Sequence, residues 1–154
     1  MIITMSDNQH PLSQQEFDSI FSKVPRLTVE IIVKNDNGEV YLTKRAIEPC
    51  KGQWHLPGGT VRFGEPMVEA VKRIASRELG IDVQQTANKG YIEYPSHYLN
   101  GLDSPVGMVF EVTRYKGKLR VNDEASGSGW FSELPEKIHA DQDKFLLNNG
   151  YLKT

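Results

Sequence analysis

The sequence predicts an α/β domain, and three observations carry this prediction. Runs of branched aliphatic residues at 27–33 and 106–113 are typical of buried strands. An amphipathic helix is predicted over 66–79, directly after a pair of glycines. A short helical segment precedes the first strand, and two short helices are predicted at 133–139 and 141–149. Helices and strands that alternate along one chain favour helices packed on a sheet.

The first helical segment is predicted to begin at Ser13. Glu16 follows Ser13 by three positions, which is the spacing of a capping box. Phe17, Ile20 and Phe21 then form one apolar stripe. Such a stripe packs on the chain's own sheet or on a second subunit, and the sequence leaves both alternatives open.

A β-hairpin is expected next, from strands at 27–33 and 40–43. Residues 35–38 are Asn-Asp-Asn-Gly, which tolerate positive φ in a tight turn. Glu30 lies within the first strand, between Val29 and Ile31. It occupies either an outward position produced by strand alternation or a position that faces a polar cleft.

The later part of the chain reads as strands and turns. Short strand pieces are predicted at 81–83 and 91–94, and residues 106–113 form the clearest later strand, followed by a turn at 116–118. Residues 123–129 are small and polar, the composition of a loop that covers a substrate.

The glycine pair Gly58-Gly59 stands immediately before the long helix. Without a Cβ atom, these residues allow other groups to approach bare backbone carbonyls and N–H groups. The helix that follows is predicted to begin at Pro66 and to end at Gly80, because proline is tolerated in a first turn and glycine ends helices in a left-handed conformation.

Glu78 lies near the edge of the apolar face of this helix, four residues after Ile74. One interpretation is an interface-edge carboxylate paired with Arg73 or Lys72. The other is a metal ligand aimed at the glycine loop, and the fixed distance to that loop favours it.

Composition limits the partners of the chain. It has 154 residues, one cysteine and a formal net charge of −2, with basic and acidic residues interspersed. We therefore expect one domain over 1–154, with 1–25 as a helical extension, and small-molecule partners rather than nucleic acid or membrane. A single cysteine, Cys50, and the lack of a signal-type segment at 1–5 predict a cytoplasmic location.

The segment from Gly59 to Ile81 resembles a Nudix box, whose pattern is Gly, five residues, Glu, seven residues, then Arg-Glu-aliphatic-x-Glu-Glu-x-Gly-aliphatic. The residues that match are Gly59, Glu65, Arg73, Ala75, Glu78, Gly80 and Ile81. Ile74 and Arg77 stand where the pattern has glutamates. The resemblance implies an α/β/α sandwich around a mixed β-sheet.

The departures point to a subfamily. The chain is similar to the GDP-mannose mannosyl hydrolases, in which the same two glutamates are missing and the last one binds a single Mg²⁺. This resemblance covers nearly the whole chain and implies a nucleotide-sugar pocket and a homodimer. It fails at Ala125-Ser126, where the subfamily has a Gln-His pair that supplies a metal ligand and the general base.

The resemblance implies a metal site for Mg²⁺ or Mn²⁺ with few protein ligands. Glu78 and the backbone carbonyls of Gly58 and Gly59 are assigned to the ion, because a hard cation takes oxygen ligands. Glu65 and Arg73 are interpreted as groups that fix the glycine loop.

The remaining site residues are assigned to substrate and catalysis. Arg45 is predicted to bind the diphosphate, because its planar fork matches phosphate oxygens, and it is counted among the catalytic residues. Glu30, His97 and Tyr98 are assigned to substrate binding through the resemblance. Glu124, Asp123 and His97 are the candidates for the general base, with Glu124 ranked first and His97 second, and the remaining alternative is that the chain has no efficient base.

Three residues beside these candidates receive structural interpretations. Trp54 is predicted to be a packing anchor, His55 a structural histidine on a strand and Cys50 a half-buried loop thiol.

Three functions follow from these assignments. The first is a Mg²⁺-dependent hydrolase of a GDP-mannose-like nucleotide sugar, which releases nucleoside diphosphate and sugar. The second is a Nudix pyrophosphatase that acts on another nucleoside diphosphate derivative. The third is a nucleotide-sugar binding module with weakened catalysis.

Overall fold

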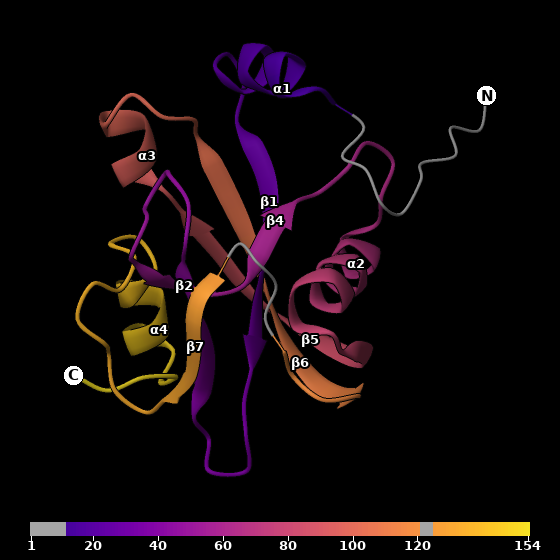
Figure 1. Ribbon diagram of the computed structural model, residues 1–154, viewed down its shortest axis with the longest axis vertical. Helices are drawn as coiled ribbons and strands as arrows, with labels where there is room; N and C mark the ends of the chain where they lie inside the picture. Colours follow the sequence, from indigo (N-terminus) through magenta and orange to yellow (C-terminus); the bar gives the residue numbers. More distant parts are fainter. Residues whose placement is uncertain (1–11, 121–124) are drawn as a thin grey trace.

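The computed structural model describes residues 12–120 and 125–154 (Figure 1). The helices are α1 (Gln14–Phe21), α2 (Met67–Leu79), α3 (Pro95–Leu99) and α4 (Asp143–Asn148). The strands are β1 (Arg26–Val33), β2 (Val40–Arg45), β3 (Trp54–His55), β4 (Gly58–Thr60), β5 (Asp82–Glu93), β6 (Pro105–Lys116) and β7 (Ala125–Phe131).

The strands form two sheets. The larger sheet has the order β4-β1-β6-β5 and is mixed: β1 pairs with β6 in parallel, whereas the pairs β1–β4 and β5–β6 are antiparallel. The smaller has the order β3-β2-β7 and is antiparallel throughout.

Strand alternation along β1 divides the core in two. Ile31 faces α2 and packs in a cluster that includes Ile74 of that helix. Ile32 faces the opposite side and packs in a second cluster with Leu42 of β2 and Leu146 of α4. The layers are therefore α2, the mixed sheet, and the smaller sheet with α4 (Figure 1). This confirms the predicted α/β/α arrangement around a mixed sheet.

The helix boundaries follow the sequence signals closely. The backbone N–H of Glu16 donates to Ser13 Oγ at 3.1 Å, so Ser13 caps α1. Gly80 caps α2 with φ of +68°, a conformation that suits glycine. No residue of α1 is buried, and its apolar stripe does not enter either core cluster.

The predicted hairpin is wrong in its pairing. β1 and β2 follow one another through a tight turn, with Asn35 N–H donating to the Glu39 carbonyl at 3.1 Å. Their only backbone pairing in the described chain is one bridge between Lys34 and Val40, after which they enter different sheets. The physical reason is that β4 and β6 already occupy both edges of β1, which leaves β2 to build a second sheet.

Three further expectations need correction. The pieces at 81–83 and 91–94 belong, for the most part, to one strand, β5, whose register shifts at bulges against β6. Residues 125–129 form part of β7 rather than a loop. The segment 133–139 is not helical, because the backbone of residues 137–139 pairs with Trp54. The rest of the predicted loop, 123–124, lies outside the described residues.

Candidate functional site

One cavity of about 680 Å³ is lined by half of the predicted site residues. Glu30 of β1, Arg45 at the end of β2, His97 of α3, and Gly58 and Gly59 of β4 all line it. The volume lies within the range of roughly 300–1,000 Å³ that is usual for small-molecule sites. Four elements distant in sequence thus place their polar groups around one space, called the main cavity below.

Gly58 is required by the close approach of Glu30. The two residues are cross-strand partners in β4 and β1, and a Cβ atom on Gly58 would collide with the Glu30 carboxylate. Gly107 of β6 flanks Glu30 on the other side, where a Cβ would lie 2.7 Å from Glu30 Oε1. Glycines on both neighbouring strands make the room that the carboxylate occupies.

Glu30 faces the main cavity and is 7% exposed. Alternation puts it on the face of β1 opposite α2, so the cleft-facing interpretation holds and the outward one is wrong. Thr28 Oγ1 donates to Glu30 Oε1 at 3.0 Å, and the Tyr94 hydroxyl also hydrogen-bonds to the carboxylate. Burial raises the pKa of Glu30 to about 7, although the bonds from Tyr94 and Thr28 lower it.

The backbone of Gly58 is directed away from β1. Ile31 N–H donates to the Pro57 carbonyl and Val61 N–H to the Leu27 carbonyl. Because hydrogen-bonded and non-hydrogen-bonded pairs alternate in an antiparallel ladder, the pair of Gly58 and Glu30 is of the second kind. In the described part of the chain no strand pairs with the outer edge of β4. The Gly58 carbonyl is therefore available to a ligand.

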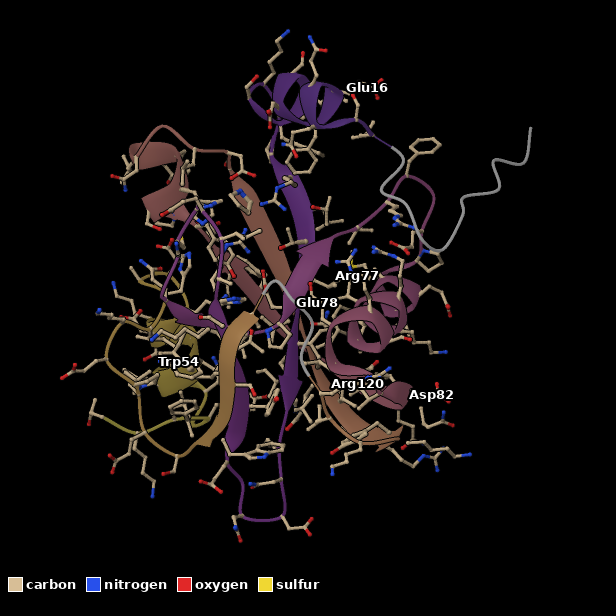
Figure 2. The ribbon with its side chains drawn as sticks, viewed as in Figure 1. Glu16, Trp54, Arg77, Glu78, Asp82 and Arg120 are labelled. Carbon is tan, nitrogen blue, oxygen red and sulfur yellow. The ribbon has the colours of Figure 1, made fainter. Side chains whose placement is uncertain are left out.

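Glu78 lies near the C-terminal end of α2 and its side chain is 16% exposed. Arg77 Nη2 lies 3.3 Å from Glu78 Oε1 and 3.8 Å from the place where a Cβ on Gly59 would stand. Figure 2 shows both side chains between α2 and β4. The negative charge of Glu78 also acts on Glu30 and raises its pKa.

This donor set fits one hard cation. The carboxylate of Glu78 and the carbonyl of Gly58 are oxygen ligands, as Mg²⁺ and Mn²⁺ prefer. The guanidinium of Arg77 brings a fixed positive charge to the same corner. Its charge disfavours a second metal ion at this corner, and the single-ion site stays a prediction from the sequence.

Glu65 and Arg73 form a clamp behind the glycine loop. Arg73 Nε donates to Glu65 Oε2 at 2.8 Å and Arg73 Nη2 to Glu65 Oε1 at 2.9 Å. Nη2 also donates to the Thr60 carbonyl at 2.9 Å. Burial would raise the pKa of Glu65, but the bonds from Arg73 and from Arg62 N–H outweigh it and lower the pKa. Arg73 therefore pairs with Glu65, not with Glu78.

Arg45 presents an unsatisfied donor. Its Nε is buried and has no hydrogen-bond partner among the described residues. A buried donor without a partner loses its hydration, so an anionic ligand in the main cavity would restore the missing bond. This geometry suits a phosphate group.

His97 belongs to a chain of hydrogen bonds on the wall of the main cavity. Its Nδ1 lies 3.1 Å from Asp103 Oδ1, and its Nε2 lies 3.2 Å from Nε2 of His139. Asp141 N–H donates to His139 Nδ1 at 3.2 Å. One proton arrangement satisfies all three contacts, with protons on His139 Nε2 and His97 Nδ1.

The charges in this chain are set by burial and by neighbours. Burial would raise the pKa of Asp103, but the hydrogen bond from His97 and the charge of Arg26, whose Nε lies 2.5 Å from Asp103 Oδ2, lower it to about 2. Burial and the nearby His97 lower the pKa of His139 to about 4. His139 is thus neutral at pH 7 and Asp103 is anionic.

The other predicted residues have mixed outcomes. Tyr98 is 53% exposed and does not line the main cavity, because successive helical side chains point about 100° apart and its neighbour His97 takes the inner position. Trp54 packs edge-on against Phe131 with ring centroids 4.8 Å apart, as an anchor should. His55 lines the main cavity, and its Nδ1 lies 2.7 Å from the Leu56 carbonyl. Glu124 falls outside the described residues.

Several functional side chains carried no recognisable sequence signal. Gln142 accepts from Leu56 N–H at 2.8 Å and donates to the Tyr94 hydroxyl at 2.9 Å, so it supports the group that bonds to Glu30. Thr28 alone could have been found, since it stands two residues before Glu30 on the same strand face.

The comparisons with known proteins agree with this geometry. Residues 24–148 match the family model described as NUDIX domain. A relative from Haloferax volcanii, the low-salt glycan biosynthesis protein Agl8, is 31% identical over 139 residues, which cover 88% of each chain. An ADP-ribose pyrophosphatase from Methanocaldococcus jannaschii is 32% identical over 124 residues, covering 79% of this chain and 71% of that protein.

A solved structure shares the arrangement. The MutT NUDIX hydrolase from Burkholderia pseudomallei superposes with a TM-score of 0.71 at 31% identity and covers 79% of this chain and 95% of its own. No helix within the described residues has both the length and the hydropathy to cross a bilayer.

Proposed function

Since the chain belongs to the Nudix hydrolase family, we propose that it hydrolyses a GDP-mannose-like nucleotide sugar to nucleoside diphosphate and free sugar. The observation that carries this proposal is the corner between α2 and β4. There Glu78 has Arg77 beside it, and a positive charge next to a single helical carboxylate favours one divalent ion over several. Displacing a diphosphate from a sugar carbon needs less charge neutralisation than attack on phosphorus, so one ion suffices.

Two further features favour a sugar substrate. The main cavity has a buried carboxylate, Glu30, and an imidazole, His97, on its walls, and both can hydrogen-bond to hydroxyl groups. A relative that covers 88% of this chain is named for glycan biosynthesis. Sugar hydroxyls are the ligand groups that such walls recognise.

Family members generally need a divalent metal ion, and we propose Mg²⁺ or Mn²⁺ held by Glu78 and the Gly58 carbonyl, with Gly59 beside them. When bound, the ion screens the diphosphate and stabilises the leaving group. Arg45 supplies a forked donor to the phosphates through its unsatisfied Nε. Glu65 and Arg73 hold the loop that presents the carbonyl.

The proton of the attacking water needs a base. Glu124 stays the prediction from the sequence, with His97 as the second candidate. The structure adds Glu30, because a carboxyl group whose pKa is about 7 can accept a proton at neutral pH. The three candidates are separated by the rates of Glu124→Gln, His97→Gln and Glu30→Gln.

A second function is favoured by one comparison. The M. jannaschii relative is named an ADP-ribose pyrophosphatase, and such an enzyme attacks phosphorus instead of carbon. We keep pyrophosphate cleavage of another nucleoside diphosphate derivative as the alternative, and binding without turnover as a third outcome.

We also propose a homodimer formed through α1. None of its residues is buried within the chain, and Ile20 is 41% exposed. In Figure 1, α1 lies beyond the end of β1, at the edge of the molecule. Light scattering on the purified protein should give twice the chain mass, and the variant Ile20→Asp should give the mass of one chain.

Product analysis in ¹⁸O-labelled water tests the reaction. With GDP-mannose and Mg²⁺ we expect GDP and mannose, with the label on mannose, because water attacks the sugar carbon. GMP and mannose 1-phosphate with label on phosphate would establish the alternative. Saturable binding without products would leave only the binding module. Glu78→Gln serves as the control for contaminating activity.

A further inference from the structure

Three metal-ligating side chains converge on the wall of the main cavity. They are Cys50 of the loop between β2 and β3, His97 of α3 and His139 of the segment before α4. Their ligand atoms, Sγ and the ring nitrogens, all lie within 4.8 Å of one another. None of the three is on the corner between α2 and β4, where Glu78 and the glycine pair lie.

The two imidazoles already have the spacing of ligands on one ion. Nε2 of His97 and Nε2 of His139 are 3.2 Å apart. Two nitrogens at 2.0–2.1 Å from a tetrahedral zinc ion would be about 3.3 Å apart. The rings are held at 28° to each other by burial, being 9% and 6% exposed.

A carboxylate stands behind each imidazole. Asp103 Oδ1 lies 3.1 Å from Nδ1 of His97, and Asp141 Oδ2 lies 4.0 Å from Nδ1 of His139. Histidines that bind metals characteristically donate their second N–H to a carboxylate or carbonyl, which orients the ring and strengthens the ligand. At His97 this support is in place, whereas at His139 the carboxylate lies beyond hydrogen-bond distance and Nδ1 accepts from the Asp141 N–H at 3.2 Å.

Cys50 is positioned by an unusual backbone. Its φ is +65°, a left-handed conformation that is uncommon for residues other than glycine. The loop is held by Gln53 N–H donating to the Cys50 carbonyl at 3.1 Å and Gly52 N–H donating to the Arg45 carbonyl at 2.8 Å. A strained residue fixed in this way over a cluster of imidazoles indicates a functional position.

We propose that Cys50 Sγ, His97 Nε2 and His139 Nε2 form a transition-metal site of the zinc class, with its fourth position open to the main cavity. The site goes beyond the proposed hydrolysis, which uses oxygen ligands at the other end. Metal binding requires that the Cys50 thiol lose its proton to solvent and that the His139 proton move from Nε2 to Nδ1. The hydrogen bond that Nδ1 accepts from Asp141 N–H is then lost, and the new N–H faces the Asp141 carboxylate, whose Oδ2 lies 4.0 Å away. Nothing is oxidised or reduced.

The ligand types select the ion. Thiolate and imidazole suit Zn²⁺, Co²⁺ and copper, whereas Mg²⁺ and Mn²⁺ prefer oxygen. Three protein ligands with one open position are the arrangement found at zinc sites that also bind a water or a substrate. The ion would tie the Cys50 loop to α3 and to the segment before α4.

Titration of the chelator-treated protein with Co²⁺ alone tests the site. Because Cys50 is the single cysteine, a near-ultraviolet thiolate-to-cobalt charge-transfer band can arise from this residue only. We expect one equivalent to saturate the band and Zn²⁺ to remove it by displacement. Reaction of the thiol with a disulfide reagent should slow in the presence of Zn²⁺.

Variants distinguish a built site from a bare thiol. Cys50→Ser should lose the band, and His97→Gln and His139→Gln should each weaken Co²⁺ binding by at least about 100-fold, since removal of a supporting group already costs 10–100-fold. His55→Gln, a cavity histidine outside the cluster, is the matched control and should bind as the natural chain does. Circular dichroism checks that each variant is folded.

Two results would overturn the proposal. One is the absence of a charge-transfer band in the folded natural chain at saturating Co²⁺. The other is a band whose midpoint is the same in both folded histidine variants, which would show binding to the thiol alone.

Discussion

The two ends of the main cavity use different donor atoms. The oxygen end consists of Glu30 and Gly58, which line the cavity, and of Glu78 at the adjoining corner between α2 and β4; it presents carboxylates and a backbone carbonyl. The nitrogen–sulfur end consists of Cys50, His97 and His139. Both ends are built by segments far apart in the sequence, yet the oxygen end rests on a strand and a long helix, whereas the nitrogen–sulfur end rests on a loop, a short helix and a turn.

This difference shows how one cavity can keep two kinds of cation apart. Hard ions such as Mg²⁺ bind imidazole and thiolate weakly, whereas softer ions such as Zn²⁺ bind these ligands most strongly. The ends are joined by Gln142, which is bonded to Tyr94 and through it to Glu30. A perturbation at one end should therefore reveal whether the two behave as separate sites.

The largest effect is expected from Glu78→Gln. The change removes the only carboxylate that α2 directs toward the glycine pair, while the side-chain volume stays nearly constant. Turnover of GDP-mannose should fall by about 10²- to 10³-fold, the range for loss of one transition-state stabiliser. Steady-state kinetics at saturating Mg²⁺ measures it, and the cobalt band at Cys50 should not change.

Glu69→Gln on the same helix is the control for this prediction. Its carboxylate is exposed and lies 3.6 Å from Lys72 Nζ, away from the glycine pair. Equal losses in both variants would mean that helix charge, not a ligand, had been removed, and full activity of Glu78→Gln would refute the metal assignment.

Glu30 should give the next largest effect, in the pH dependence of stability. In the folded chain the pKa of Glu30 is raised from 4.5 to about 7, chiefly by burial and also by the charge of Glu78. The groups that lower this pKa are Tyr94, Thr28 and Arg26. A raised carboxyl pKa means that the folded state holds the proton more tightly. Its contribution is therefore complete below pH 4.5 and is lost as the pH rises through 7.

Urea unfolding in the presence of a chelator measures this contribution. The unfolding free energy of the natural chain relative to Glu30→Gln should fall by about 3 kcal/mol between pH 4.5 and pH 8, from 1.36 kcal/mol per pKa unit. Thr28→Val removes a hydrogen bond that lowers the pKa of Glu30. In this variant the stability contribution of Glu30 should therefore be lost at a higher pH. A difference that does not vary with pH would show that Glu30 is not buried as a carboxyl group.

The oxygen end was largely predictable because its signals are local. Helix α2, its left-handed cap at Gly80 and the pair of Glu65 with Arg73 follow from spacing within 24 residues of one another, and the structure confirms each of these three features. Local periodicity decides which side chains share a helix face. For Glu30 the sequence left a cleft-facing and an outward orientation open, and only the tertiary fold decides between them.

The nitrogen–sulfur end could not be predicted because it is made by chain topology. Positions 50, 97 and 139 have no common period, and the sequence assigned a loop thiol to Cys50, substrate binding to His97 and no role to His139. The same reason explains the hairpin error, since the turn at 35–38 was recognised while the competition of β4 and β6 for the edges of β1 is not visible in the sequence. Contacts between distant segments depend on which edges and faces remain available.

The smallest effect is expected from Arg73→Lys, which tests how the oxygen end is positioned. Lysine keeps the charge and loses the planar fork, so the two parallel bonds to Glu65 and the bond to the Thr60 carbonyl cannot all persist. We expect a loss of about 1–2 kcal/mol in unfolding free energy and roughly tenfold weaker Mn²⁺ binding. Electron paramagnetic resonance counts unbound Mn²⁺ and gives the affinity. Lys72→Arg on the neighbouring exposed position is the control.

Because the clamp touches only the glycine loop, Co²⁺ binding at Cys50 should stay constant, and a parallel loss there would mean that the two ends form a single coupled site.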